Sequence, residues 1–300
     1  MDLCECAAAV NRGRHRMCYS LVETKSYSQR TEHTKTMTKM RKLLSRSLLA
    51  VAVAGGLAMT PGTAYAELYN DFKIDPTVLG NDDVCATFSG TYGTECIADR
   101  MDAQYVERFT VTGFDTVTNT GTFATDAYAN LLGFVTNEAT EPLLGTGLND
   151  DYAIYALFSA MGTFQPNSDG GFDFFADSGS LDLVRDSNVD TTKQVPAASP
   201  GAFVLGNTGD DIDLANAVLQ TGEGHTTSDP DSGDFEIRFD PFTLTALGLT
   251  FFVEPVPFYT DLLLRGLFDA FVPAAGFNAI VQGSANAQFL PEPATLALFG

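Results

Sequence analysis

Aspartate-rich segments are the parts of residues 67–300 whose spacing could hold a metal ion. The segment Asp186-Ser187-Asn188-Val189-Asp190 places oxygen ligands at alternate positions, as the first half of an EF-hand loop does. Thr191 stands where that loop needs glycine, and Ala197 stands where it needs glutamate, so the segment is not an EF-hand. Turns that use aspartate for local hydrogen bonds are the alternative interpretation. The calcium candidates are Asp186, Asn188, Asp190, Asp210, Asp211 and Asp213.

His225 is the one histidine of residues 67–300, and it lies in a segment rich in Gly, Thr and Ser. We expect it to be an exposed loop residue. A single histidine makes a His-based zinc site hard to build, and the same holds for a two-histidine iron site or a Ser-His-Asp triad. A carboxylate pair could still serve a hydrolase acting on polysaccharide. Because the chain has no Trp to stack on sugars, we expect no catalytic residues and keep that enzyme as an alternative.

The charge of the main body excludes one class of partner. Residues 67–300 carry seven basic and 34 acidic side chains. Such an excess of negative charge repels phosphate backbones, so we expect no nucleic-acid partner. The 23 Phe residues and the many β-branched residues nevertheless favour a folded core over disorder.

The amino-terminal region predicts export. Residues 37–66 combine a basic start, a short apolar run and a small-residue cleavage motif, which is the pattern of a secretory signal peptide. Ala64 and Ala66 would occupy the −3 and −1 positions, and Glu67 would begin the mature chain. Residues 1–36 lack apolar periodicity, and we interpret them as a disordered extension from a misassigned start codon. Cys85 and Cys96 are the two cysteines left after cleavage, and in an exported chain they predict a disulfide.

The carboxyl-terminal segment, residues 290–300, holds a more specific signal. Pro291-Glu292-Pro293 stands directly before an apolar run, and this arrangement resembles the PEP-CTERM sorting signal of Gram-negative bacteria. That resemblance implies processing by an exosortase and a transient anchor in the inner membrane. Only seven residues follow Pro293, too few for a membrane-spanning helix, so we expect a truncated sorting signal.

Shorter motifs lie between these ends in a fixed order: Phe72-Lys73-Ile74-Asp75-Pro76, residues 121–125, 142–149 and 152–158, Asp210-Asp211-Ile212 and Pro255-Val256-Pro257-Phe258. In this order they resemble the motifs of flocculation-associated PEP-CTERM proteins. The resemblance implies an exported, non-enzymatic matrix protein that promotes flocculation or retains cells in exopolysaccharide, with extracellular polysaccharide as its partner. It gives no catalytic residues to carry over. We expect no cofactor, with calcium as the alternative. A calcium-dependent adhesin is the second alternative, beside the polysaccharide-acting enzyme.

The pattern of residues 67–289 predicts an all-β domain. Runs rich in β-formers are separated by clusters of Gly, Asn, Asp and Pro, which is typical of short antiparallel strands. We expect a jelly-roll-like β-sandwich with long acidic loops, which residues 186–234 should form, and one or two short helices, at residues 211–220 and 261–271. On one strand, Phe235, Ile237 and Phe239 should face inward while the residues between them face outward. The strand runs are residues 105–117, 121–128, 152–164, 171–185, 235–253 and 276–289.

Overall fold

The computed structural model describes residues 70–79, 85–87, 96–136, 139–228, 233–269 and 271–291. Every described residue lies within the unit of residues 63–300. Within these ranges no helix has the length and the apolar character needed to cross a membrane. Several predictions from the sequence lie outside the described residues: the extension 1–36, the signal segment 37–66 with Ala64 and Ala66, and also Glu67, Glu292 and Pro293.

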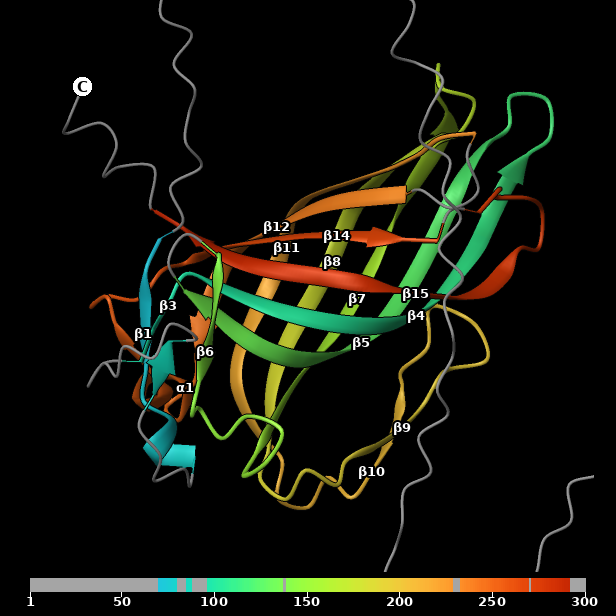
Figure 1. Ribbon diagram of the computed structural model, residues 1–300. Coiled ribbons are helices and arrows are strands. Elements are labelled where there is room, and N and C mark those ends of the chain that lie inside the picture. The colour runs from blue at the N-terminus through green and yellow to red at the C-terminus, as the bar shows by residue number, and fades with distance from the viewer. Residues whose placement is uncertain are drawn as a thin grey trace, which may run out of the picture. The chain divides into compact units, whose positions relative to one another are not determined.

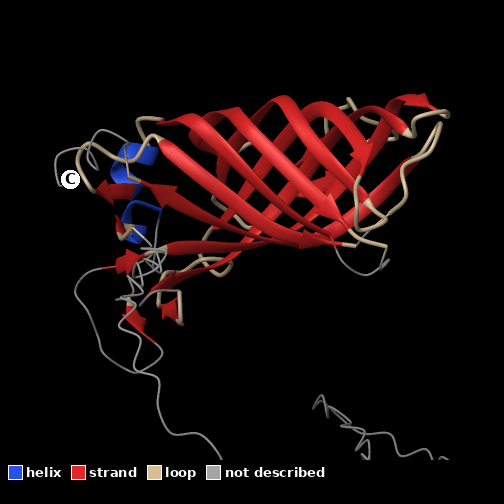
Figure 2. Ribbon diagram, turned by 90° about the horizontal axis from the view of Figure 1, so that it is seen from above, coloured by secondary structure: helices blue, strands red, loops and turns tan. Residues whose placement is uncertain are grey.

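Eight long strands form a closed antiparallel barrel (Figure 1). Each strand pairs with the next one along the chain, and the last strand, β15, pairs back with the first, β4. The barrel is therefore an up-and-down meander. Figure 2 shows its strands running at a tilt around the barrel, as closure of a sheet requires. The strands are β4 (Arg100–Asp115), β5 (Thr120–Thr136), β7 (Ala153–Pro166), β8 (Phe172–Asp186), β11 (Ile212–Thr226), β12 (Gly233–Leu244), β14 (Asp261–Phe268) and β15 (Asn278–Leu290).

The predicted all-β antiparallel class is confirmed, but the predicted sandwich is wrong. β4 pairs with β15, and Ala103 lies opposite Ala285. This pairing joins the first and last strands, whose outer edges would remain open in a sandwich of two separate sheets. Closure satisfies the backbone N–H and C=O groups along both edges, and these would otherwise offer a template for association with other chains.

The two helices expected at residues 211–220 and 261–271 are also wrong, because residues 212–220 belong to β11 and residues 261–268 form β14. In β11 the register shifts between Asp213 and Ala215 and again after Ala217. Such bulges interrupt the alternation of a strand and leave an apolar spacing that resembles that of a helix. The short helices lie elsewhere, at η1 (Pro76–Leu79) and α1 (Gly248–Phe251).

Short strands complete the fold. A three-stranded sheet of β13 (Phe252–Glu254), β1 (Phe72–Ile74) and β3 (Cys96–Ala98) contributes to the large core at one end of the barrel. β2 (Ala86–Thr87) and β6 (Glu141–Leu144) continue outward from β5. The long connection between β8 and β11 holds the hairpin of β9 (Thr192–Gln194) and β10 (Val204–Gly206).

The predicted disulfide is confirmed: the sulfur atoms of Cys85 and Cys96 are 2.00 Å apart. Cys85 lies just before β2, and Cys96 begins β3. Since Cys85 is buried within the large apolar core, the bridge ties this part of the chain to the end of the barrel.

Two groups of aromatic side chains fill the ends of the barrel. At the β1 end, the rings of Phe72 and Phe289 meet at 5.1 Å between centroids, and Phe252 packs against both. At the opposite end lies the group that we call the Phe109 cluster, which contains Phe109, Phe123, Phe174 and Phe271. Each aromatic pair adds roughly 0.5–1.5 kcal/mol beyond its buried area, so both ends are firmly packed.

The predicted alternation of β12 is confirmed. Phe235 and Ile237 line the interior of the barrel, and Phe239 is fully buried. On the outer face, the Glu236 carboxylate accepts a hydrogen bond from Arg265 at 2.8 Å. Inward apolar and outward charged residues thus alternate along the strand, as they do along the strands of a closed barrel.

Candidate functional site

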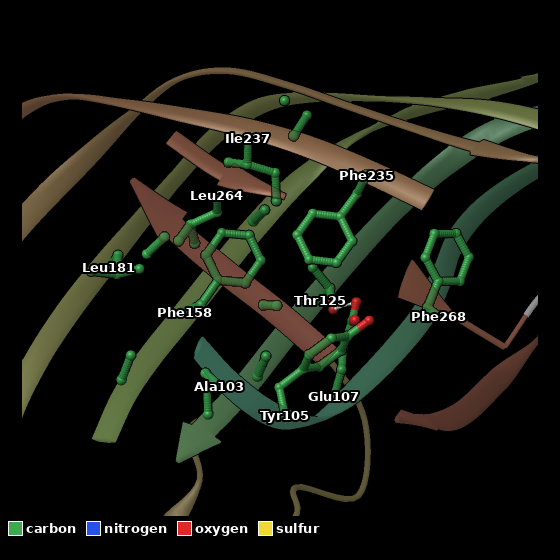
Figure 3. Close-up of a pocket in the computed structure, with 18 of the residues that line it drawn as sticks. Ala103, Tyr105, Glu107, Thr125, Phe158, Leu181, Phe235, Ile237, Leu264 and Phe268 are labelled. Carbon is green, nitrogen blue, oxygen red and sulfur yellow. Dashed lines mark hydrogen bonds between the residues drawn. The ribbon is translucent and has the colours of Figure 1, made fainter. Parts of the chain in front are cut away.

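The interior of the barrel contains a cavity of about 170 Å³. Small side chains account for it, because eight of the lining residues are alanines, among them Ala103, Ala129, Ala156 and Ala285. An eight-stranded barrel is just wide enough for its own side chains to fill, or to hold one small ligand when those side chains are small. Phe158, Leu181, Ile237 and Leu264 make the remaining walls strongly apolar (Figure 3).

Glu107 places one carboxyl group in this apolar interior. It lies on β4 with its side chain directed into the cavity, and its strand neighbours in register are Ala127 and Val281 (Figure 3). Thr125 on β5 donates a hydrogen bond to Glu107 Oε1. Burial raises the pKa of Glu107 to about 7, against the lowering effect of the Thr125 hydrogen bond and with a further increase from the charge of Asp126. The group is therefore balanced between its neutral and ionised forms near neutral pH.

Tyr105 forms the wall beside Glu107, one inward position earlier on β4. Its hydroxyl group donates to the carbonyl oxygen of Leu267 at 3.3 Å. The ring can lie across the interior because its partner in register, Gly283, has no side chain: a Cβ there would come within 2.7 Å of the Tyr105 hydroxyl oxygen. Burial first, and then the charges of Glu107 and Asp269, raise the pKa of Tyr105 above its usual range, so the phenol stays neutral.

Sequence reasoning missed Glu107, Tyr105 and Thr125, although a signal was present. In the run 105–117, Tyr105, Glu107 and Phe109 occupy alternate positions, so the carboxyl group shares a face with two aromatic rings. An acidic residue in phase with inward apolar residues is unusual, because burying an ionised carboxylate without a partner is unfavourable. This alternation alone could have predicted that Glu107 faces the interior of the β-protein.

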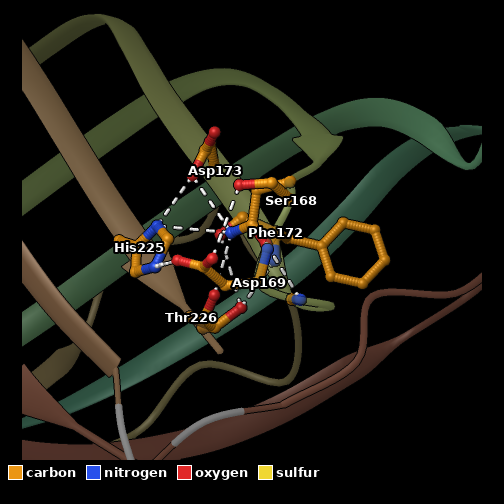
Figure 4. A network of polar contacts seen from close by, with 8 residues as sticks. Ser168, Asp169, Phe172, Asp173, His225 and Thr226 are labelled. Carbon is orange, nitrogen blue, oxygen red and sulfur yellow. Dashed lines mark hydrogen bonds and ion pairs between the residues drawn. The ribbon is translucent and has the colours of Figure 1, made fainter. Parts of the chain in front are cut away.

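The prediction that His225 is an exposed loop residue is wrong. His225 lies near the end of β11 with 35% of its side chain exposed, and its Nδ1 is 2.8 Å from Asp173 Oδ1 on β8 (Figure 4). Its Nε2 is 3.5 Å from Asp169 Oδ2 in the β7–β8 turn. The hydrogen bond with Asp173 raises the pKa of His225, and nearby acidic charges add to this effect.

The surroundings of His225 indicate a structural role. The Asn167 side chain donates to the Thr226 carbonyl oxygen at 2.9 Å, and Thr226 Oγ1 accepts from the backbone N–H of Phe172 at 2.8 Å. These contacts fasten the β7–β8 turn to the end of β11 (Figure 4). Ser168, the nearby hydroxyl, contacts Asp169 at 3.4 Å, so these contacts do not form a Ser-His-Asp relay.

Part of the predicted calcium set comes together. Asp186, Asp210 and Asp211 each bring a carboxylate oxygen to a common point, with these atoms within 4.8 Å of one another. Asp210 Oδ2 is buried and has no hydrogen-bond partner among the described residues. Asp211 accepts from the Tyr155 hydroxyl at 2.7 Å, and Asp186 accepts from the backbone N–H groups of residues 188 and 191.

The rest of the predicted calcium set lies outside this group. Asn188 contributes its backbone N–H to Asp186, at 3.1 Å. Asp190 is exposed near the group, and desolvation, followed by the charges of Asp210, Asp186 and Asp211, raises its pKa. Asp213 is exposed on β11 opposite Val184. The carboxylates of Asp186, Asp210 and Asp211 lie close together without a basic residue among them, so their charges repel one another. Calcium binding at this group stays a prediction.

The structure bears on two further predictions, the sorting signal and the carboxylate pair of a hydrolase. Pro291 directly follows β15 and is partly exposed, while Glu292 and Pro293 of the predicted sorting signal lie outside the described residues.

The described residues that line the cavity do not form the carboxylate pair that a hydrolase would need. Glu107 and Glu223 both border the cavity, but Glu223 is exposed at the surface.

Comparisons with known proteins leave the site to be judged on its own geometry. No family model, no curated protein and no solved structure matches the chain.

Proposed function

We propose that the protein is a binding protein that holds one small, largely apolar molecule inside its barrel. The observation that carries this proposal is the cavity of about 170 Å³, whose walls are almost entirely apolar and into which, among the described lining residues, Glu107 directs its carboxyl group. A well-formed apolar cavity with a few convergent polar groups and a perturbed pKa is the arrangement expected of a ligand site.

The energetic cost of an empty cavity supports this function. Protein interiors are normally close-packed, and apolar groups beside unfilled space lose the dispersion contacts that neighbouring atoms would supply. A ligand that fills the cavity would restore these contacts.

The volume limits the size of the ligand. Drug-sized ligands occupy pockets of roughly 300–1,000 Å³, whereas an apolar cavity of about 150 Å³ accepts benzene. The expected ligand therefore carries one aromatic ring or an alkyl group of similar bulk.

A cavity-filling substitution tests the proposal. Benzyl alcohol would be titrated into the protein by isothermal calorimetry. Ala103→Leu places a larger side chain in the cavity and should abolish the binding heat. Gln104→Leu is the matched control, because Gln104 is the exposed neighbour on the same strand and the same side chain is introduced. No binding to the wild-type protein, or equal binding to the Ala103→Leu variant, would reject the proposal.

The sequence also supports a biological setting for this activity. We propose that the protein is exported and non-enzymatic, and that it works at the cell surface or in an exopolysaccharide matrix, where it promotes flocculation. The Cys85–Cys96 disulfide supports export, because such bridges persist in oxidising compartments. A deletion strain complemented with and without Pro291-Glu292-Pro293 tests this setting, since normal flocculation after deletion would reject it.

A further inference from the structure

We infer that the cavity selects a small organic cation, an aromatic or alkyl group carrying one ammonium group that pairs with the Glu107 carboxylate. This inference rests on the proposed function and names its ligand class. Its basis is the juxtaposition of one inward carboxyl group, surrounding aromatic rings and apolar walls without a basic side chain.

The charge of the cavity wall excludes anionic ligands. The lining residues include no Lys, Arg or His, so the wall offers no partner to a carboxylate or phosphate. An anion would also meet Glu107, whose carboxylate repels it. Burying a charge is unfavourable unless it is paired, and the pair that this wall can offer is with a cation.

The hydrogen bonding of Glu107 leaves room for a donor. Thr125 Oγ1 donates to Oε1. In the described part of the chain, no donor meets the second carboxylate oxygen, Oε2, and the Glu107 side chain is directed into the cavity (Figure 3). An ammonium group has three donors and no acceptor, so it can satisfy this oxygen while its apolar group occupies the space between the alanines.

Aromatic rings near the carboxyl group favour a cation as well. Tyr105 and Phe235 pack edge to face at 5.9 Å between centroids, and Phe268 lies on the same side of the cavity (Figure 3). The negative face of an aromatic ring attracts a desolvated ammonium group. The 34 acidic side chains of residues 67–300 further raise the local concentration of cations around the barrel.

Three ligands with one ring and different charges test the inference. Benzylamine, benzyl alcohol and benzoate would be titrated into the full chain at pH 8. We expect benzylamine to bind about tenfold more tightly than benzyl alcohol, since a charge-assisted hydrogen bond is about twice as strong as a neutral one. Benzoate should show no binding.

Variants of Glu107 give the decisive comparison. Glu107→Gln should remove the preference for benzylamine and leave benzyl alcohol binding within a few-fold of wild type. Glu107→Asp, which keeps the charge, should retain the preference. Glu236→Gln is the matched control, because it neutralises a carboxylate on the outer face of β12, away from the cavity, and should change neither affinity. Circular dichroism and thermal melting of each variant establish that it is folded.

The outcomes separate the two proposals. If benzyl alcohol binds but benzylamine binds no more tightly, or if the preference survives in Glu107→Gln, the cation inference is overturned while the binding function stands. If neither ligand binds to the wild-type protein, the proposed function fails and the inference fails with it.

Discussion

Thr125 Oγ1 on β5 donates a hydrogen bond to Glu107 Oε1 on β4, and both residues face the interior of the barrel. This contact joins the one inward carboxyl group to the cavity wall. Because the surroundings are apolar, the protonation of Glu107 should be measurable in the stability of the whole protein.

Glu107→Gln should make the protein more stable at high pH. The pKa of Glu107 rises from its ordinary value of 4.5 to about 7 in the folded protein. Its folded form therefore binds the proton more tightly, and stability is lost as the pH rises from about 4.5 through 7. A shift of this size corresponds to about 3 kcal/mol, so urea unfolding at pH 8.5 should show the variant to be more stable by up to this amount. At pH 4 the two proteins should have nearly equal stability. Equal stability at pH 8.5 would contradict the burial of Glu107.

His225→Gln should remove a different pH dependence. The pKa of His225 is raised by Asp173, so the stabilisation is fully present below the ordinary pKa of 6.5 and is lost as the pH rises through the folded value. The wild-type melting temperature should therefore fall more between pH 6 and pH 9 than that of the variant. Asp173→Asn should reproduce the behaviour of the variant, and parallel profiles for all three proteins would argue against the His225–Asp173 pair.

Loss of the disulfide should lower stability without opening the barrel. Cys85 and Cys96 are separated by 11 positions, and the chain-entropy model gives about 3 kcal/mol for a loop of this size. A variant with both Cys85→Ser and Cys96→Ser should have a free energy of unfolding lower by this amount, measured by urea denaturation. It should keep its β-rich circular dichroism spectrum. Unchanged stability would mean that the bridge does not constrain the unfolded chain.

Asp210→Asn should raise the melting temperature at low ionic strength. The substitution removes one of three carboxylates that approach within 4.8 Å, and like charges at this distance repel. Salt should reduce the difference by screening. The calcium prediction adds a separate expectation: calcium chloride should stabilise the wild-type protein and have less effect on the variant. If calcium and magnesium have the same effect on both proteins, charge screening alone accounts for the group.

The strands were predictable because their alternation follows from local residue types, as Phe235 and Ile237 show. Closure was not, because it depends on the pairing of Ala103 with Ala285, residues far apart in the sequence. The expected helix at residues 211–220 failed because bulges near Asp213 and Leu219 disturb the period of the strand.

The candidate site was only partly accessible to sequence reasoning. Asp186, Asp210 and Asp211 could be nominated from their spacing, and the structure brings them together. The cavity could not be predicted, because a single sequence does not distinguish an alanine that lines a cavity, such as Ala129, from an alanine in a packed core. Only the assembled barrel shows that several alanines face the same space.

A crystal structure of the protein with benzyl alcohol tests the central claim most directly. The account predicts electron density for one aromatic ring inside the barrel, between the side chains of Phe158 and Phe235, and no such density in the Ala103→Leu variant. An empty interior in the wild-type crystal, or a ring bound only on the outer surface, would contradict it.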